Sequence, residues 1–160
     1  MNLHSSMRVR GHVVIDLVRD NEIRHFEMKN LTVNGGYNVL TKMILDTAQD
    51  SDQLAYIAVG TGGHEIGHIE NPLPPKPTDT QLETEVGRSP IYQFLTPEIT
   101  ELQFRATIDA NLAIDSDITE AGLLTENGTL FARVTFPAIH KGSGYYLIIT
   151  WTITLSEKVT

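Results

Sequence analysis

Hydrophobic and polar residues alternate most regularly in the C-terminal half of the chain. From residue 102 to residue 112 every second side chain is apolar, and polar or charged residues stand between them. From residue 145 to residue 155 the odd-numbered side chains are large and apolar, and the even-numbered ones include the row Thr150, Thr152 and Thr154. A period of two places alternate side chains on opposite faces of a sheet. Both segments are therefore expected to be strands with one buried and one solvent-exposed face, as in antiparallel sheets.

Turn residues mark two hairpins. Residues 13–18 are rich in β-branched side chains and residues 23–28 alternate, with Asp20-Asn21 between them, which predicts an N-terminal hairpin. Asn127-Gly128 is the strongest short hairpin signal. The strand after it is expected to end at Pro137 and the glycine-serine-glycine cluster at 142–144. One face of that strand is expected to carry Leu130, Ala132, Val134 and Phe136.

Two further elements precede the C-terminal strands. Residues 54–59 predict a short buried strand. Tyr37, Leu40 and Ile44 recur with helical spacing, and Asn34 is placed to cap the helix that they indicate. We therefore expect one α-helix near residues 35–47, with its apolar face packed on a sheet.

Glycine and proline dominate the segment between the helix and the C-terminal strands. Residues 60–80 are therefore expected to form a long surface loop. Within it, Thr78 and Gln81 form a capping-box pattern, which predicts a short helical turn. Residues 1–12 have no packing pattern of their own, and we expect an extended N-terminal arm that orders only against a neighbour.

The expected elements add up to about seven or eight strands and one helix in 160 residues. Runs of strands joined by short turns favour stacked antiparallel sheets over alternating helices and strands. We therefore expect a single domain spanning residues 1–160, mostly β, in the form of an antiparallel β-sandwich of jelly-roll-like type.

Composition narrows the classes of partner. The formal net charge is -8 at pH 7, with 12 basic residues against 20 acidic ones and no basic run, which argues against nucleic acid as the main partner. The chain has no cysteine, so disulfides and thiolate chemistry are excluded. No apolar run approaches the roughly 18 residues of a membrane span, so we expect no membrane partner.

The motif HEIGH at residues 64–68 has the spelling of a zinc-protease signature. That chemistry needs His64 and His68 on one face of a helix, with Glu65 placed to activate a zinc-bound water. Glycines before the motif, Gly67 inside it and prolines after it favour a solvated loop instead. Two loop histidines could also take up a stray metal ion, or form a metal clasp between subunits.

The remaining candidates favour structural interpretations, so we expect no catalytic, cofactor-binding or metal-binding residues. The other histidines, His4, His12, His25 and His140, are scattered along the chain. Asp115 and Asp117 suggest a calcium loop, but the EF-hand pattern is incomplete, and a turn is favoured. Trp151 is expected in the core. The threonine row at 150–154 suits either water or a neighbouring subunit.

The order of several motifs resembles a group of small virion proteins of tailed bacteriophages. These motifs are AVGTG at 58–62, PTDTQLETE at 77–85, GTLFAR at 128–133 and the terminal WTITL at 151–155. The resemblance covers residues 13–155. Proteins of this group are described as tail-fibre, tail-collar or baseplate-associated structural proteins. The group has no catalytic residues that could be carried over to this chain.

The resemblance implies a non-enzymatic structural protein of the virion, made in the host bacterial cytoplasm. It would be an oligomeric assembly component of the tail, at the collar or neck, the baseplate or the fibre attachment. Its partners would be copies of itself and other virion proteins, with no cofactor. A carbohydrate-binding β-sandwich that recognises a host surface glycan is the alternative, through Tyr92, Phe94, Tyr145 or Tyr146. A zinc hydrolase built on HEIGH is the remote alternative.

Overall fold

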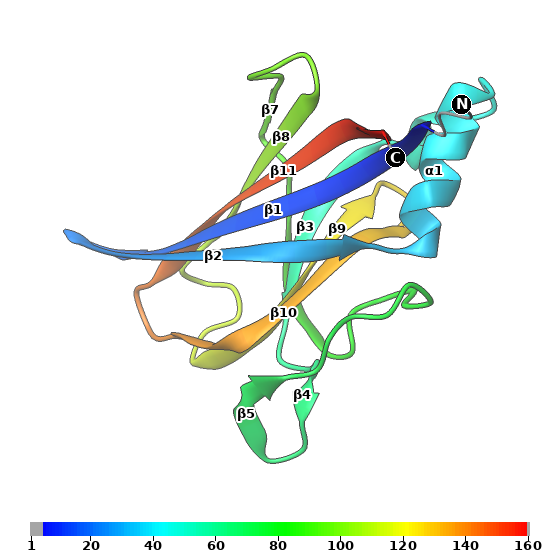
Figure 1. Cartoon of the computed structure of the whole chain (residues 1–160). Helices are drawn as coiled ribbons and strands as arrows, with labels where there is room; N and C mark the ends of the chain where they lie inside the picture. Colours follow the sequence, from blue (N-terminus) through cyan, green and yellow to red (C-terminus); the bar gives the residue numbers. More distant parts are fainter. Residues whose placement is uncertain (1–4, 160) are drawn as a thin grey trace.

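The structure, a computed structural model, describes residues 5–159. Its strands and helices are shown in Figure 1. The elements are β1 (Ser5–Arg19), β2 (Glu22–Thr32), α1 (Asn34–Ile44), the 3-10 helix η1 (Asp50–Asp52), β3 (Leu54–Gly60), β4 (His64–Glu65), β5 (His68–Pro72), β6 (Glu85–Pro90), β7 (Gln93–Leu95), β8 (Glu101–Ile108), β9 (Ser116–Thr125), β10 (Leu130–Lys141) and β11 (Tyr146–Val159).

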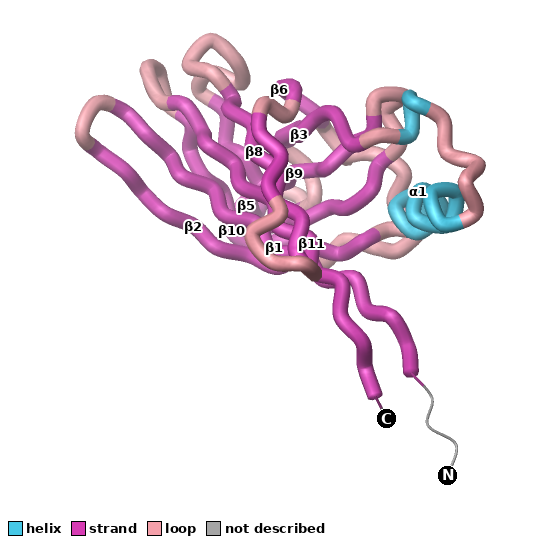
Figure 2. The backbone as a smooth tube through the Cα atoms, turned by 90° about the horizontal axis from the view of Figure 1, so that it is seen from above, coloured by secondary structure: helices cyan, strands magenta, loops and turns pink. Residues whose placement is uncertain are grey.

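Nine strands form one curled antiparallel sheet in the order β6-β3-β9-β10-β2-β1-β11-β8-β7. Its first and last strands, β6 and β7, are joined by two residues only, Ile91 and Tyr92. The amide of Ile91 donates to the carbonyl of Ala55 in β3, and the amide of Tyr92 donates to the carbonyl of Arg105 in β8. The chain therefore crosses here from one end of the sheet to the other. This curling gives the mostly β, sandwich-like fold that the sequence predicts (Figures 1 and 2).

Strand β2 makes the corner on the opposite side. Residues 22–30 of β2 pair with β1, whereas Leu31 and Thr32 pair with Arg133 and Ala132 of β10. Beyond this short junction β2 and β10 diverge (Figure 1), and a groove of about 510 Å³ lies between them. The two halves of the sheet therefore enclose a shared core.

Alternation along the strands builds that core. Val13, Ile15 and Leu17 of β1 point inward and are almost fully buried, as are the odd-numbered residues 147–153 of β11. Trp151 lies at the centre, and its indole nitrogen donates a hydrogen bond of 3.1 Å to Asn30, which satisfies its polar group. The expectation that Trp151 belongs to the core is confirmed.

A smaller apolar cluster covers the outer face of the β3–β9–β10 layer. It contains Val33, Ala58, Leu82, Leu124 and Leu130. The prediction that Leu130 shares a face with Ala132, Val134 and Phe136 was wrong, because an irregularity between residues 130 and 132 turns Leu130 to the other side. A bulge of this kind breaks the period of two.

Other boundaries also differ from the predictions. Strand β10 does not end at Pro137 but continues to Lys141, with its register shifted between Thr135 and Ile139. The segment around Thr78 and Gln81 forms turns and bends instead of a helical turn. Leu82 is held in the smaller cluster there, so the chain follows the sheet surface rather than coiling.

Helix α1 is shorter and less buried than the sequence predicts. It ends at Ile44, and Val33 rather than Asn34 is its N-cap. Val39 is buried, but Tyr37 is 48% exposed and Ile44 is 74% exposed. The expectation that its apolar face packs on the sheet is met in part: Val39 and Leu40 pack into the main core, whereas Tyr37 and Ile44 do not.

The proposed arm and loop both contain strands. Residues 5–10 of the expected arm belong to β1 and pair with β11 of the same chain, so they do not wait for a neighbour to order them. Residues 1–4 lie outside the described part of the chain. The expected loop at 60–80 carries the small β4–β5 hairpin, which projects from the body (Figure 1).

Two neighbouring isoleucines on β11 test this register. Ile149 is fully buried, whereas Ile148 points to the outer face and is only partly buried. We expect Ile149→Ala to lower the free energy of unfolding by about 2–5 kcal/mol, because it opens a cavity in the core. Ile148→Ala is the matched control and should cost less than about 1 kcal/mol. Urea unfolding measures both, and equal losses would contradict the register.

Candidate functional sites

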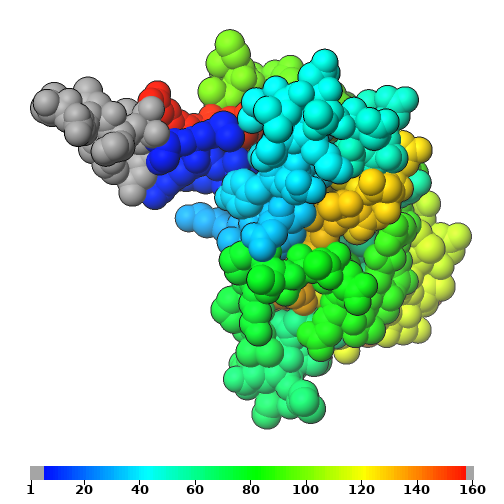
Figure 3. All heavy atoms as spheres, turned by 90° about the vertical axis from the view of Figure 1, so that its right-hand side faces the viewer, coloured from blue at the N-terminus to red at the C-terminus, as the bar shows by residue number. Residues whose placement is uncertain are grey.

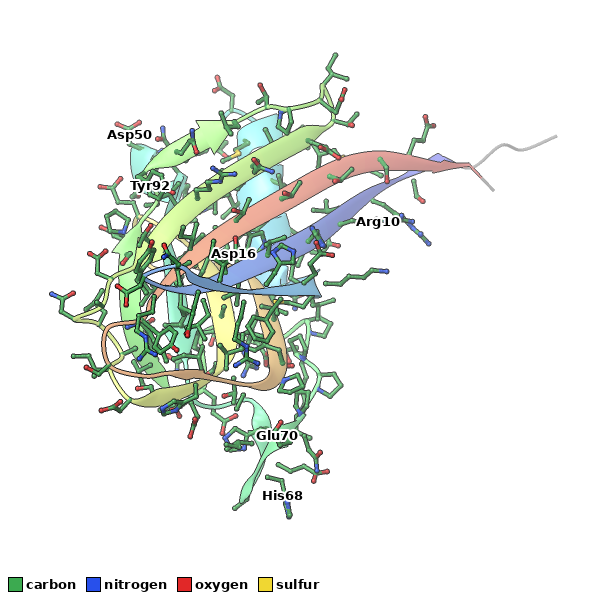
Figure 4. All side chains as sticks on the ribbon, turned by 90° about the vertical axis from the view of Figure 1, so that its left-hand side faces the viewer. Arg10, Asp16, Asp50, His68, Glu70 and Tyr92 are labelled. Atoms are coloured by element: carbon green, nitrogen blue, oxygen red, sulfur yellow. The ribbon has the colours of Figure 1, made fainter. Side chains whose placement is uncertain are left out.

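The HEIGH motif forms a hairpin rather than a helix. His64 and Glu65 make up β4, His68 begins β5, and Gly67 takes the positive φ of +77° that the turn requires. Ile66 at the tip is 98% exposed. The expectation of a plain loop is corrected to a two-stranded hairpin. Figure 4 shows His68 and Glu70 pointing into solvent at its end.

This geometry separates the groups that zinc chemistry must bring together. The ring nitrogens of His64 lie 2.7 Å from the carbonyl oxygen of Glu65 and 3.0 Å from that of Thr61, so backbone groups occupy both. Within residues 5–159 there is no group of three histidine or carboxylate side chains arranged to hold a metal ion. In the described residues, the HEIGH motif has neither the helix nor the set of metal ligands that a zinc hydrolase requires. His4 lies outside the described residues.

A buried carboxylate instead organises the loop that carries the hairpin. Glu120 of β9 is 0% exposed. Its Oε1 accepts hydrogen bonds from the amides of Gly62 (3.2 Å) and Thr84 (2.8 Å). Its Oε2 accepts one from the amide of Glu83 at 3.1 Å. One side chain therefore holds both ends of the segment from residue 62 to residue 84 against the sheet.

Arg133 of β10 completes this network. Its Nε and Nη2 donate to Oε2 of Glu120 at 3.1 and 2.6 Å, and its Nη1 donates to Asp79 at 2.7 Å. Burial alone would lower the pKa of the Arg133 guanidinium, but its hydrogen bonds to Asp79 and Glu120 outweigh that effect and raise the pKa. A buried charge is tolerated only when it is paired and hydrogen-bonded in this way.

Close approach of the backbone explains a glycine in this network. A Cβ on Gly62 would lie 2.6 Å from the Cβ of Glu83, which is too close for any substituent. Gly62 also accepts a 2.6 Å hydrogen bond from the Thr119 hydroxyl through its carbonyl. The two sides of the loop therefore meet at van der Waals contact over the sheet.

The motifs quoted for the phage resemblance meet in this network. Gly62 comes from AVGTG, Asp79 and Glu83 come from PTDTQLETE, and Arg133 ends GTLFAR. Their observed role is to hold the loop on the sheet. Sequence reasoning missed Glu120, although a single carboxylate inside the apolar stretch of β9 was a usable signal, because such a charge requires a buried partner.

Removing the charge of Glu120 should loosen the loop. We expect Glu120→Gln to lower the free energy of unfolding by about 3–5 kcal/mol, because Arg133 loses its buried partner. It should also open residues 62–84 to proteolysis. Glu85→Gln is the matched control: it breaks the partly exposed pair with Arg88 and should cost about 0–1 kcal/mol. Equal losses in chemical unfolding would contradict a special role for Glu120.

A second group of titratable side chains lies on the outer face of β1 and β2. The His25 ring bonds to Asp16 (2.7 Å) and to Glu27 (3.0 Å), and His12 lies 3.8 Å from Glu27. The hydrogen bond to Glu27, and then the one to Asp16, raise the pKa of His25 above 6.5. The hydrogen bond from His25 lowers the pKa of Glu27 below 4.5. The group is exposed (Asp16 is labelled in Figure 4), so it is a surface ion-pair cluster.

The raised pKa of His25 and the lowered pKa of Glu27 define a pH range, from 4.5 to 6.5, in which both groups contribute fully to stability. Because the pKa of His25 is raised, its contribution to stability is complete below pH 6.5 and is lost as pH rises through the raised value. Because the pKa of Glu27 is lowered, its contribution is complete above pH 4.5 and is lost as pH falls through the lowered value. NMR titration should show that Glu27→Gln lowers the pKa of His25 more than Asp16→Asn does; the reverse order would contradict this.

The other sequence candidates are scattered. His140 bonds to Asp117 at 2.9 Å, and Asp117 lies on β9 rather than in the expected turn. Residues 142–144 form the turn between β10 and β11, where Gly144 has a φ of +81°. The Thr150–Thr154 row lies partly exposed on the outer face, where Thr152 accepts a hydrogen bond from Gln103.

One end of the sandwich remains open beside α1. A cavity of about 280 Å³ lies there between the helix and strands β7, β8 and β11. We call it the apolar mouth. Its lining includes Leu40, Met43, Phe94, Leu102, Ile153 and Leu155. Two of its lining residues, Met43 and Phe94, are 45% and 58% exposed, and Ile44, which follows Met43 at the end of α1, is 74% exposed.

A two-stranded ribbon projects from the same end. We call it the terminal ribbon, and it consists of residues 5–9 of β1 paired with residues 155–159 of β11. β2 joins β1 only from Gly11, and β8 joins β11 only up to Thr154. Beyond these points the outer edges of the described ribbon residues have no strand beside them, although the amide of Leu155 still donates a 2.8 Å hydrogen bond to the carbonyl of Thr100. Figures 2 and 3 show the ribbon standing clear of the body.

Comparisons with known proteins identify no family. No protein-family model matches the chain, and no curated protein matches it. They add no support to the resemblance seen in the sequence. In the described part of the chain, neither helix is long and apolar enough to cross a membrane.

Proposed function

We propose that this chain is a non-enzymatic structural protein of a bacteriophage virion, an oligomeric assembly component of the tail. The collar or neck, the baseplate and the fibre attachment are the candidate positions. The motif resemblance supports the class. The fold is compatible with it, since a rigid β body offers surfaces and edges for neighbouring copies and other virion proteins.

The observation that most favours an assembly role is the open end of the sandwich. There the apolar mouth, an exposed helix face and a ribbon with unpaired edges lie together. Isolated exposed side chains are common, but contiguous apolar surface of this kind marks protein interfaces. Unpaired strand edges are also templates for pairing with another chain.

Mass spectrometry of purified phage particles, with light scattering of the isolated chain, tests the proposal. We expect the protein in intact particles at a fixed ratio to the major tail proteins. The isolated chain should form discrete oligomers. A protein that is absent from particles and monomeric at high concentration would overturn the proposal.

A carbohydrate-binding module for host recognition is the second candidate. The observation in its favour is that Tyr92, just before the edge strand β7, and Phe94, on that strand, are each 58% exposed. Aromatic rings at a surface are platforms for sugar stacking. Tyr145 is less suited, because its hydroxyl donates to Glu22 and Arg19 lies over its ring. Glycan-array binding that Tyr92→Ala abolishes, but that Ile148→Ala leaves intact, would favour this role.

A further inference from the structure

The groove between β2 and β10, which we call the β2–β10 groove, is lined by strand edges. Residues 25–28 of β2 stand on one side and residues 135–139 of β10 on the other. Successive side chains of a strand point to opposite faces. A groove that touches several residues in a row on both sides therefore runs along the backbone of the two strands. Its volume of about 510 Å³ lies within the usual range of ligand pockets, roughly 300–1,000 Å³.

The edge of β2 that faces the groove has no neighbouring strand. β2 pairs with β1 along residues 22–30, but it pairs with β10 only at Leu31 and Thr32. In the part of the chain that the structure describes, no other strand joins β2. One edge of residues 22–30 is therefore free along the groove.

The direction of the backbone groups follows from the junction with β10. In an antiparallel strand, alternate residues direct both the amide and the carbonyl at the same neighbour. The amide of Val33 donates to the carbonyl of Phe131 in β10, in the same register as the pair Leu31 and Arg133. The odd-numbered residues of β2 therefore face β10. Those beside the free edge are Ile23, His25, Glu27 and Lys29.

Strand β10 does not supply the missing partner. Its register with β9 shifts between Thr135 and Ile139, and Pro137 within this stretch has no N–H to donate. The Thr135 hydroxyl is already bonded to the carbonyl of Leu73. β2 and β10 diverge here (Figure 1), so the backbone groups of β2 are left without a strand to pair with.

The floor of the groove is apolar. Phe136 and Ile139 are 3% and 2% exposed and belong to the main core. Phe26 and Met28 are partly buried against the same core. A strand lying in the groove would place every second side chain on this floor.

The outer rim of the groove is acidic. Glu27 lines the groove, and it shares the ring of His25 with Asp16, which is labelled in Figure 4. Two carboxylates thus stand beside one imidazole. Charge complementarity favours basic side chains on the outward positions of an occupant.

These features select the kind of occupant. A row of free amides and carbonyls is satisfied by another extended backbone, in the manner of strand addition. A strand between β2 and β10 needs both of its own edges free. The terminal ribbon and the β4–β5 hairpin, which project from the described body, are two-stranded, so each of their strands already uses one edge. The occupant is therefore a single extended segment of a different protein.

We propose that the β2–β10 groove binds one extended segment of a partner protein, which adds as a strand to the free edge of β2. Its inward apolar side chains lie on Phe26, Met28 and Ile139, and its outward basic side chains lie beside Glu27. The proposal rests on the proposed assembly role, for which it gives the contact to a neighbouring virion protein.

Amide hydrogen exchange, followed by NMR on the isolated chain, tests the free edge. The amides of Phe26 and Met28 face β1 and should exchange slowly. The amides of His25 and Glu27 face the groove and should exchange at least about tenfold faster. Equal protection of all four would overturn the proposal, because it would show that the chain itself or a second copy covers this edge.

A probe peptide tests strand addition. The probe alternates valine and lysine over about seven residues, the length of an ordinary strand. We expect it to protect the amides of His25 and Glu27 and to leave those of Phe26 and Met28 unchanged. The same peptide N-methylated at every residue keeps its side chains but has no N–H, so it should not bind. Unchanged exchange with the first peptide, or equal binding of both, would overturn strand addition.

Two substitutions at one position separate backbone from charge. Glu27→Pro removes an N–H that faces the groove rather than β1, and it should weaken binding of the probe by at least about tenfold. Glu27→Gln keeps the N–H and should weaken binding by less than about fivefold, as expected for an exposed charge. Equal losses, measured by fluorescence anisotropy on variants with an unchanged urea midpoint, would contradict backbone pairing.

The groove and the assembly role fail separately. A protein that is present in phage particles at a fixed ratio but binds no probe would retain the assembly role and lose strand addition. A chain that binds the probe but is absent from particles would retain the peptide groove and lose the proposed virion partner.

Discussion

The buried ion pair between Glu120 and Arg133 is the interaction on which the rest of the architecture depends. Five donors surround the Glu120 carboxylate: three backbone amides of the loop and two guanidinium nitrogens. Desolvation of a carboxylate is costly, and this complete set of partners offsets the cost. Because two amides come from residues 83 and 84 and the third from Gly62, the same carboxylate closes a long excursion of the chain. The segment from residue 62 to residue 84, which is rich in glycine and proline, is thereby held in place over the sheet.

The segment held in this way covers one outer face of the sheet and leaves other surfaces exposed. Leu82 and its neighbours fill the outer face of the β3–β9–β10 layer, and the outer face of the β1–β11 layer is mostly polar. The end beside α1 has no comparable cover among the described residues, and the apolar mouth opens there. The network thus joins the loop to the sheet beside the smaller apolar cluster, in which Leu82 directly precedes Glu83.

The β4–β5 hairpin shows how context decides the meaning of a motif. Residues 64–68 of the hairpin have the sequence of a zinc-protease helix, but only helical spacing would bring the two histidines onto one face. With Gly67 in a turn, His64 bonds to the backbone and His68 points outward. The composition around the motif already favoured an irregular segment, although it could not indicate the two short strands.

The sequence by itself determined the strands with a clear period, because alternation fixes which side chains face the core. Strands β8 and β11, the N-terminal hairpin and the Asn127-Gly128 turn followed from local pattern. The mostly β fold class followed from the same patterns.

Only the tertiary structure decided the rest. Strands β6 and β7 have no period that marks them, since they form where the sheet meets its own end. The turning of Leu130 to the outer face depends on an irregular register with β9. The exposure of α1 depends on where the sheet stops, and the role of Glu120 depends on residues 36 to 58 positions away. Local pattern indicates that a side chain needs burial or a partner, but only long-range packing supplies them.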